Sequence, residues 1–293
     1  MKWQDIFIEV QDLMQILPTS ELSSKQVMPT LFDCRFQLAM NQQPAKGVEF
    51  YQSHHIPGAF YLDLEKELSG PIDNTSSRHP WPSDAQIEDI AQQYQIKQDS
   101  PIVFYDNGKL AFAGRAWLAF QLAGYHRCRL LNGGIDAYDN YLLKNPTIGS
   151  SSPTVDIDDL FYSVNLPVEL VSRTELDKRT LVDAREDFRF RGEKEPIDPV
   201  AGTIPDALNA PWLENFNDNG QFHSQSWHQP RWSNLITSSQ SDKSAGISNS
   251  TSPVHFCGSG VTAIVNIISA LLGTDSGQKL YPGGWSEYLH FTK

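Results

Sequence analysis

Cysteine is scarce in this sequence, and every long apolar stretch is interrupted. The 293 residues include three cysteines, an odd number without Cys-x-x-Cys spacing, which argues against a disulfide framework or a zinc site and favours a reducing compartment. The longest apolar stretch, 261–272, contains Asn266 and Ser269 and is far shorter than the roughly 20 residues that span a bilayer. The amino terminus lacks the apolar region of a signal peptide. We therefore expect a cytoplasmic protein without a membrane partner.

Positive charge is also in short supply. The chain has 23 Lys and Arg against 35 Asp and Glu, for a formal net charge of −12. Nucleic-acid-binding proteins present a basic face to phosphates, so no nucleic-acid partner is expected. At roughly 100–200 residues per domain, the length predicts two domains, each large enough to bury its own core.

The two halves of the chain repeat one another. Four motifs recur in the same order and at nearly one spacing: Asp33-Cys34-Arg35 with Asp183-Ala184-Arg185, His55-Ile56-Pro57-Gly58-Ala59 with Thr203-Ile204-Pro205-Asp206-Ala207, Val103-Phe104-Tyr105-Asp106 with Val254-His255-Phe256-Cys257, and Asn132-Gly133-Gly134 with Pro282-Gly283-Gly284. The repeat predicts a domain at 1–144, a linker rich in turn formers at 145–159, and a second domain at 160–293. A further polar tract, 237–252, is expected to be a surface loop.

Short apolar runs alternate with helical patterns in both halves. Strands are predicted at 180–183, 252–256 and 279–281, and helices at 114–122 and 261–272. This alternation predicts an α/β fold in which each copy is a mostly parallel sheet flanked by helices. Ligands of such sheets bind beyond the carboxyl ends of the strands, so the loops that follow strands are the candidate functional segments.

The most informative of these loops begins at Cys257. It reads Cys257-Gly258-Ser259-Gly260-Val261-Thr262, between a predicted strand and a predicted helix. A helix amino terminus and backbone N–H groups freed by glycines lower the pKa of a thiol, which favours the nucleophilic thiolate. Cys34 and Cys128 are not followed by such a turn and are expected to be structural.

Phosphatases that form a phosphocysteine use a similar loop. They carry an arginine six positions after the cysteine, which binds the phosphoryl oxygens through two N–H groups. The sixth position here is Ala263, so phosphatase chemistry is not expected.

These motifs, with the closing Tyr281-Pro282-Gly283-Gly284-Trp285-Ser286-Glu287-Tyr288, resemble the two-domain sulfurtransferases of the rhodanese and 3-mercaptopyruvate type, from about Leu31 to Tyr288. The resemblance implies that Cys257 takes a sulfane sulfur from a small donor as a persulfide and passes it to a thiol or cyanide acceptor, with thioredoxin a candidate. The backbone N–H groups that it implies around the persulfide are those of Gly258, Gly260, Val261 and Thr262. It implies no metal or organic cofactor. Asp106 stands where a first-domain cysteine would be, which implies a silent first domain.

The resemblance also bears on the donor. Thiosulfate-using enzymes tend to carry cations at the second and third loop positions, where this chain has Gly258 and Ser259. A neutral loop with a serine that moves a proton resembles the mercaptopyruvate enzymes, and Arg189 matches their substrate-binding arginine. Their second arginine, nine residues later, is Asp198 here, so Asp198→Arg is expected to improve turnover. Arg191 or Lys194 could take its place.

Three functions therefore stay open at this point: a 3-mercaptopyruvate sulfurtransferase, a thiosulfate sulfurtransferase, and a persulfide-relay protein without its own small-molecule donor. Among the remaining polar residues, His79 is expected to hold a loop, and the role of His55 is left open between a loop contact and the site. Arg185 is expected to form a salt bridge.

Overall fold

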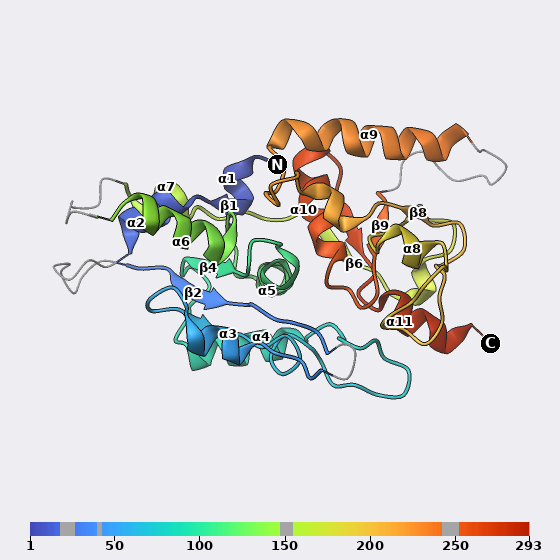
Figure 1. Ribbon diagram of the computed structural model, residues 1–293, viewed down its shortest axis with the longest axis horizontal. Coiled ribbons are helices and arrows are strands. Elements are labelled where there is room, and N and C mark those ends of the chain that lie inside the picture. Colours follow the sequence, from blue (N-terminus) through green and yellow to red (C-terminus); the bar gives the residue numbers. More distant parts are fainter. Residues whose placement is uncertain (18–26, 40–42, 147–154, 242–251, 293) are drawn as a thin grey trace.

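The computed structural model describes residues 1–17, 27–39, 43–146, 155–241 and 252–292. They form two five-stranded sheets that lie side by side, one in each half of the chain (Figure 1). The strands of the first sheet are β1 (Phe7–Ile8), β2 (Thr30–Asp33), β3 (Phe60–Tyr61), β4 (Ile102–Tyr105) and β5 (Cys128–Leu131). Those of the second are β6 (Val168–Leu170), β7 (Leu181–Asp183), β8 (Leu208–Asn209), β9 (Val254–Phe256) and β10 (Gln278–Leu280).

The two sheets have the same topology. Their strand orders are β1-β5-β4-β2-β3 and β6-β10-β9-β7-β8, and every strand pair is parallel. Numbered within its own half, each sheet therefore has the order 1-5-4-2-3. This agreement confirms the predicted duplication of a parallel α/β fold.

Helices cover both faces of each sheet. Those of the first half are α1 (Trp3–Ile6), α2 (Val10–Ile16), α3 (Val48–Ser53), α4 (Asp84–Gln93), α5 (Ala111–Leu122) and α6 (Gly134–Lys144). Those of the second half are α8 (Asp187–Phe190), α9 (Gln225–Ser241), α10 (Ala263–Gly273) and α11 (Gly284–Tyr288), while α7 (Ile157–Leu160) packs in the core of the first half. Short 3₁₀ turns lie at Arg173–Glu175, Trp212–Asn215 and Leu289–Phe291. None of the helices in the described ranges combines the length and apolar character needed to cross a membrane.

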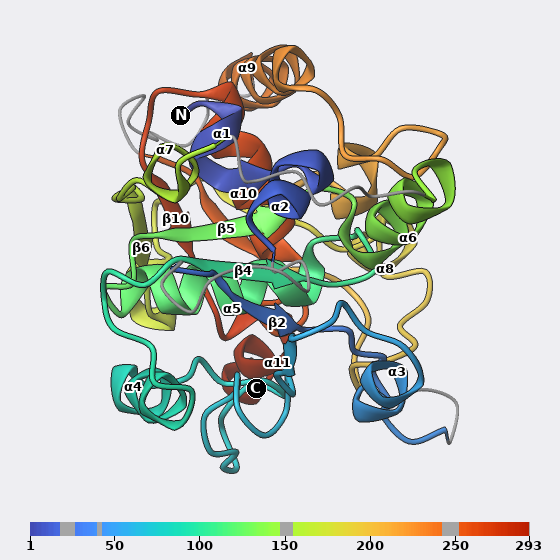
Figure 2. The ribbon, with the colours of Figure 1, turned by 90° about the vertical axis from the view of Figure 1, so that its left-hand side faces the viewer.

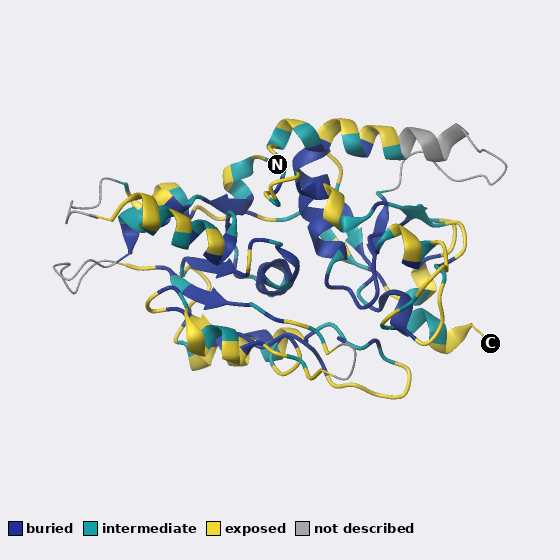
Figure 3. Cartoon of the chain, in the orientation of Figure 1, coloured by how far each residue is buried: buried dark blue, intermediate teal, exposed yellow. Residues whose placement is uncertain are grey.

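Successive side chains of each strand point to opposite faces of the sheet, so the first half has two apolar cores, one on each face. Phe32 and Phe104 face one side, where α4 and α5 pack, while Leu31 and Val103 face the other side, under α2 and α6. Successive strand residues point to opposite faces, so a fully buried strand has to be apolar on both. Strands β1, β4, β5, β7 and β9 are accordingly buried, as are α10 and nearly all of α5, whereas the described outer face of α9 is largely exposed (Figure 3).

One apolar core joins the two halves. Helices α5 and α10 pack against each other at the centre of the molecule (Figure 1), and their side chains belong to one buried cluster. Gly114 on α5 allows this approach, because a Cβ there would lie 3.2 Å from Cγ2 of Ile264. The amino terminus also lies against the second half (Figure 2), where the Met1 ammonium donates to the Leu271 carbonyl. The halves are therefore held together by extensive burial.

The packing of the first half continues past the predicted linker. Ile157, Leu160 and Phe161 pack in the core under α2 and α6, and the backbone N–H of Val164 donates to the His126 carbonyl at 3.0 Å. Residues 147–154 of the linker lie outside the described residues. Since β6 of the second sheet begins at Val168, we propose that the chain passes between the halves at 165–167.

The start of the polar tract at 237–252 is not a loop. Helix α9 continues to Ser241, and residues 242–251 lie outside the described residues. Neither polarity nor serine content excludes a helix when the preceding turns are already formed, because extension of a helix is far easier than its nucleation.

Asp106 follows β4 at the position opposite Cys257 in the repeat, and its carboxyl group is buried. Four backbone N–H groups donate to it: Gly108 at 2.9 Å, Leu110 at 3.1 Å, Phe112 at 3.2 Å and Ala113 at 3.3 Å. Burial raises the pKa of this carboxyl, but all four of these partners are donors, so the ionised form is the one that matches the loop. The first half thus has a strand-to-helix loop that surrounds an anion supplied by the chain itself.

Asp106→Asn is expected to destabilise the protein by about 2–6 kcal/mol. An amide presents one acceptor oxygen instead of two, so at least two of the four buried N–H groups would lose their acceptor, at about 1–3 kcal/mol each. The measurement is urea unfolding at neutral pH, with exposed Asp89 on α4 changed to Asn as the matched control. Equal unfolding midpoints for Asp106→Asn and Asp89→Asn would contradict this account of the loop.

Candidate active site

Cys257 lies at the carboxyl end of β9, in a tight turn into α10. The strand ends at Phe256 and the helix begins at Ala263, so residues 257–262 form a short connection, called here the cysteine loop. Gly260 has φ of +69°, a left-handed conformation that glycine adopts without strain. Cys257 is only 2% exposed. The predicted strand, turn and helix are all present, with the helix starting two residues later than expected.

The cysteine loop is fixed by the closing motif of the chain. The backbone N–H of Trp285 donates to the Cys257 carbonyl at 2.8 Å, and that of Ser286 donates to the Gly258 carbonyl at 2.9 Å. Gly284 has φ of +60°, and a Cβ there would lie 2.5 Å from the Cys257 carbonyl oxygen. The two sequence motifs are therefore parts of one local structure, in which a larger residue at 284 has no room.

The first half of the chain supplies an arginine to the same loop. Arg115 on α5 is fully buried and donates through Nη1 to the Gly260 carbonyl at 3.1 Å. Its other N–H groups donate to the carbonyls of Leu68, His79 and Pro80. Burial lowers the pKa of Arg115 to about 9, an effect that the Cys257 thiolate partly opposes. Arg115 thus ties the cysteine loop to the segment that contains His79.

His79 contacts the serine of the cysteine loop. Its Nδ1 lies 2.8 Å from Oγ of Ser259, a hydrogen bond between the two halves. Burial, together with Arg115 and Arg78, lowers the pKa of His79 to about 3, so the ring is neutral at physiological pH. Glu65 Oε1 is 3.9 Å from Nε2, beyond hydrogen-bonding distance. The expectation that His79 only holds a loop is therefore incomplete, because its ring also forms a hydrogen bond with Ser259 of the cysteine loop.

A cluster of charged side chains lies beside Gly258. Arg189 donates through Nε to both carboxylate oxygens of Glu195 at 3.0 Å and through Nη2 to Asp198 at 3.2 Å. The other Asp198 oxygen accepts from Arg78 of the first half. Asp198 therefore bridges two guanidinium groups. An arginine at 198 would place three cations together, so the improvement expected of Asp198→Arg is withdrawn.

Arg191 and Lys194 are not brought to this cluster. The Arg191 guanidinium is half exposed and forms ion pairs with Asp187 and Glu193, with no hydrogen bond to a described residue of the cysteine loop. Lys194 is exposed. Arg189 and Arg191 are two residues apart on a helical turn, a spacing that puts side chains on different faces. The substrate-binding role expected of Arg191 therefore has no support from the geometry.

Two other polar residues have structural contacts. Arg185 forms a buried salt bridge with Asp183 through two N–H groups, as expected. His55 Nδ1 donates to the Tyr51 carbonyl, 2.8 Å away, and the ring stacks on that of Tyr51. His55 thus contributes to a local turn in the first half.

Cys34 and Cys128 are buried thiols without a glycine-rich loop. Burial raises the pKa of both, and the Cys128 thiol donates to the Tyr125 carbonyl at 3.0 Å. Both therefore remain protonated and unreactive at neutral pH. Within the described residues, no group of three or more His, Cys, Asp or Glu is arranged to hold a metal ion.

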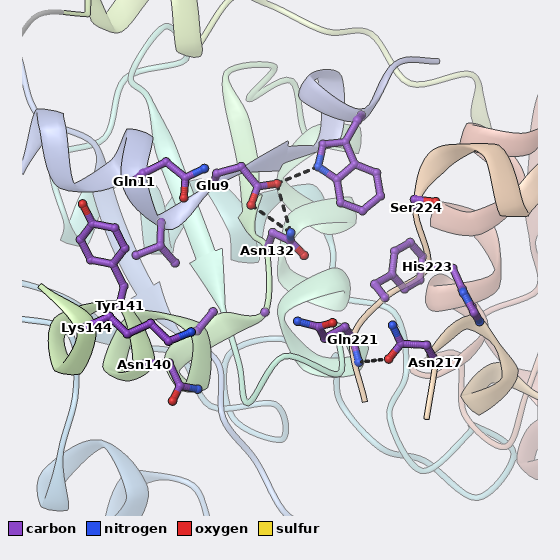
Figure 4. Close-up of a pocket in the computed structure, with 15 residues that line it drawn as sticks. Glu9, Gln11, Asn132, Asn140, Tyr141, Lys144, Asn217, Gln221, His223 and Ser224 are labelled. Atoms are coloured by element: carbon purple, nitrogen blue, oxygen red, sulfur yellow. Dashed lines mark hydrogen bonds between the residues drawn. The ribbon is translucent and has the colours of Figure 1, made fainter. Parts of the chain in front are cut away.

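A cavity of about 780 Å³ lies elsewhere between the two halves (Figure 4). Glu9 in its wall accepts hydrogen bonds from the Trp3 indole at 2.9 Å and from the Asn132 amide at 3.0 Å. Gly133 also lines it and packs against Gly108 in the loop of Asp106. No described residue of the cysteine loop lines this cavity, so it is separate from the site at Cys257.

Three contributors to the site were missed or underrated from sequence: Arg78, Arg115 and His79. All three come from the first half, and His79 lies 180 positions from Ser259. The only sequence signal was the basic pair Arg78-His79 within a polar segment. Sequence alone does not show which distant loop such a pair meets.

Comparisons with known proteins agree with this fold. Residues 19–141 match the rhodanese-like domain model. A probable 3-mercaptopyruvate sulfurtransferase of Pseudomonas aeruginosa is 36% identical over 281 residues, 94% of this chain and 95% of that protein. A putative thiosulfate sulfurtransferase, SseB of Mycobacterium tuberculosis, is 34% identical over 88% of this chain and 87% of its own length. The crystal structure of SseA, a 3-mercaptopyruvate sulfotransferase of Escherichia coli, superposes with a TM-score of 0.67 at 25% identity and covers 96% of this chain and 98% of its own.

Proposed function

This chain belongs to the rhodanese family of sulfurtransferases, and from that premise we propose that its sulfur donor is 3-mercaptopyruvate. The protein is a sulfurtransferase. The observation that carries the choice of nucleophile is the cysteine loop itself. A thiol at the end of β9 precedes a tight turn into α10, the arrangement that stabilises a thiolate.

The loop of Asp106 supports the persulfide step. At the equivalent place in the first half, four backbone N–H groups surround a carboxylate. A persulfide anion on Cys257 needs the same kind of partner, for which we propose backbone N–H groups at Gly258, Gly260, Val261 and Thr262. The two loops differ in detail, since Gly108 and Leu110 are left-handed in one and Gly260 in the other.

In the proposed reaction, the Cys257 thiolate attacks the thiol sulfur of the donor. A sulfur–sulfur bond forms, the carbon–sulfur bond breaks, and its electron pair leaves on the enolate of pyruvate, which takes up a proton. The outer sulfur then passes to an acceptor thiolate or to cyanide, and the Cys257 thiolate is regenerated. Thioredoxin is the proposed protein acceptor, and the cytoplasm the proposed compartment.

Ser259 and His79 are proposed to move the proton. The Ser259 hydroxyl is two residues after Cys257 and hydrogen-bonded to Nδ1 of a neutral imidazole. A hydroxyl that can accept and donate in turn suits the protonation of the leaving enolate. His79 acts here as a positioning residue, because it reaches the reaction through Ser259.

The charge of the site favours a monoanionic donor. Arg78 and Arg189 are balanced by Asp198 and Glu195, and the loop itself carries no cation. Thiosulfate, a dianion, requires more uncompensated positive charge than this arrangement offers. Asp198 is also the feature that keeps the alternatives of a thiosulfate enzyme and of a persulfide relay open.

The test is a steady-state comparison of 3-mercaptopyruvate and thiosulfate as donors with one acceptor. We expect a higher kcat/KM for 3-mercaptopyruvate. A higher value for thiosulfate would select the rhodanese alternative. No turnover with either donor, combined with sulfur transfer from a persulfidated partner protein, would select the relay function.

A further inference from the structure

Arg78 reaches the cysteine loop from the other half of the molecule. Its Nη2 lies 2.7 Å from the point that a Cβ of Gly258 would occupy, and Arg189 Nη2 and Asp198 Oδ2 are each 3.6 Å from that point. Two cations and one carboxylate therefore meet next to Cys257. The backbone N–H of Arg78 also donates to Ser286 Oγ at 3.2 Å, which holds its segment on the closing motif.

Exposure distinguishes Arg78 from its neighbours. Its side chain is 28% exposed, against 8% for Arg189 and 1% for Asp198. Burial lowers its pKa to about 10, so it stays charged at neutral pH. Arg78 is thus the cation of this cluster that an anion arriving from solvent meets first.

Asp198 shows that a carboxylate fits between the two guanidinium groups. One of its oxygens accepts from Arg78 and the other from Arg189. A donor carboxylate bound at Nη2 of Arg78, the atom nearest Gly258, would leave the contact between Asp198 and Nη1 in place. Such an arrangement avoids the large cost of an uncompensated buried charge at Asp198, whose side chain is 1% exposed.

We propose that Arg78 supplies the second positive charge for the carboxylate of the donor, with Asp198 as its counter-ion. The proposal rests on the proposed function. The second arginine of the mercaptopyruvate enzymes is expected at position 198, so the charge that is missing there comes from the opposite half of the chain. Donor binding then depends on how the two halves are held together.

The test compares Arg78→Gln with Arg127→Gln. Arg127 is also a partly exposed arginine of the first half in an ion pair with an aspartate, but it lies at the amino end of β5, the edge opposite the loops that follow strands. Two measurements are made on each: KM and kcat for 3-mercaptopyruvate, and the rates at which Cys257 is alkylated by iodoacetate and by iodoacetamide. The two reagents differ in a carboxylate, so their rate ratio reports attraction of a carboxylate to the thiol.

For Arg78→Gln we expect a KM about 10-fold higher with kcat nearly unchanged, and an iodoacetate-to-iodoacetamide ratio about 10-fold lower, the effect of one charge-assisted hydrogen bond. Arg78→Lys, which keeps the charge, should recover most of the ratio. Arg127→Gln should change neither quantity. An unchanged ratio in Arg78→Gln overturns the proposal. A lowered ratio in a protein that does not turn over 3-mercaptopyruvate would refute the proposed donor and leave the anion site standing.

Discussion

Replacement of Cys257 by serine is expected to abolish sulfur transfer. In the proposed mechanism the Cys257 thiolate forms the persulfide, and a serine hydroxyl at neutral pH is neither ionised nor able to hold a sulfane sulfur. Incubation of the wild-type protein with a donor should add the mass of one sulfur atom to the peptide that contains Cys257. In Cys257→Ser both this adduct and turnover should be lost.

The matched control is Cys128→Ser. Cys128 is also buried, and serine can donate to the Tyr125 carbonyl as the thiol does. This variant should keep the adduct and the turnover. Thermal unfolding of Cys257→Ser should stay close to that of the wild type, since no side-chain hydrogen bond of Cys257 is among the described contacts and serine is nearly isosteric. An adduct on Cys34 or Cys128 that survives Cys257→Ser would refute the assignment.

Removal of Arg189 should lower kcat/KM for 3-mercaptopyruvate by about 10- to 150-fold, the equivalent of the 1.5–3 kcal/mol of a charge-assisted hydrogen bond. Its guanidinium lies beside Gly258, and Arg189→Ala would leave a donor carboxylate without this partner. The measurement is steady-state turnover with each donor, and we expect the mercaptopyruvate reaction to be impaired more than the thiosulfate reaction.

Arg189→Ala also leaves Glu195 and Asp198 with fewer partners, so its stability has to be measured alongside. Arg189→Lys keeps the charge but loses the paired N–H contacts with Glu195. Comparison of this variant with Arg189→Ala therefore separates the effect of the charge from that of the hydrogen-bond geometry. Rapid alkylation of Cys257 by iodoacetamide in both variants would show that the loop is intact. Unchanged turnover of 3-mercaptopyruvate in a folded Arg189→Ala would contradict the role of this arginine.

The proposed donor site contains a pair of charges that the sequence places 120 positions apart. Asp198, which looked like the loss of a substrate-binding group, is the partner of Arg78. From the sequence, Asp198 predicted weaker binding of the donor. From the structure, its contact with Arg78 predicts a donor site whose second cation comes from the first half of the chain. The variant Asp198→Arg, expected from the sequence to improve turnover, is therefore expected to disrupt the charge cluster.

The sequence by itself determined the features that depend on neighbouring residues. Parallel strands, the strand-to-helix turn at Cys257 and the glycines at 260 and 284 follow from hydrophobic period and local backbone geometry, and the repeat follows from matching motifs. The same local rules predict a linker rich in turn formers at 145–159. They do not predict that Phe161, which follows this linker, packs in the core of the first half under α2 and α6.

Tertiary structure alone decided which side chains meet at the thiol. Arg189 and Arg191 are alike in sequence, yet one is buried in the cluster and the other is half exposed, because a two-residue step changes the helical face. Arg115, His79 and Arg78 reach the cysteine loop only because α5 and α10 pack through a shared apolar core. Burial of apolar surface is non-directional, so a pattern of apolar residues predicts that helices will pack but not which polar side chains this packing aligns.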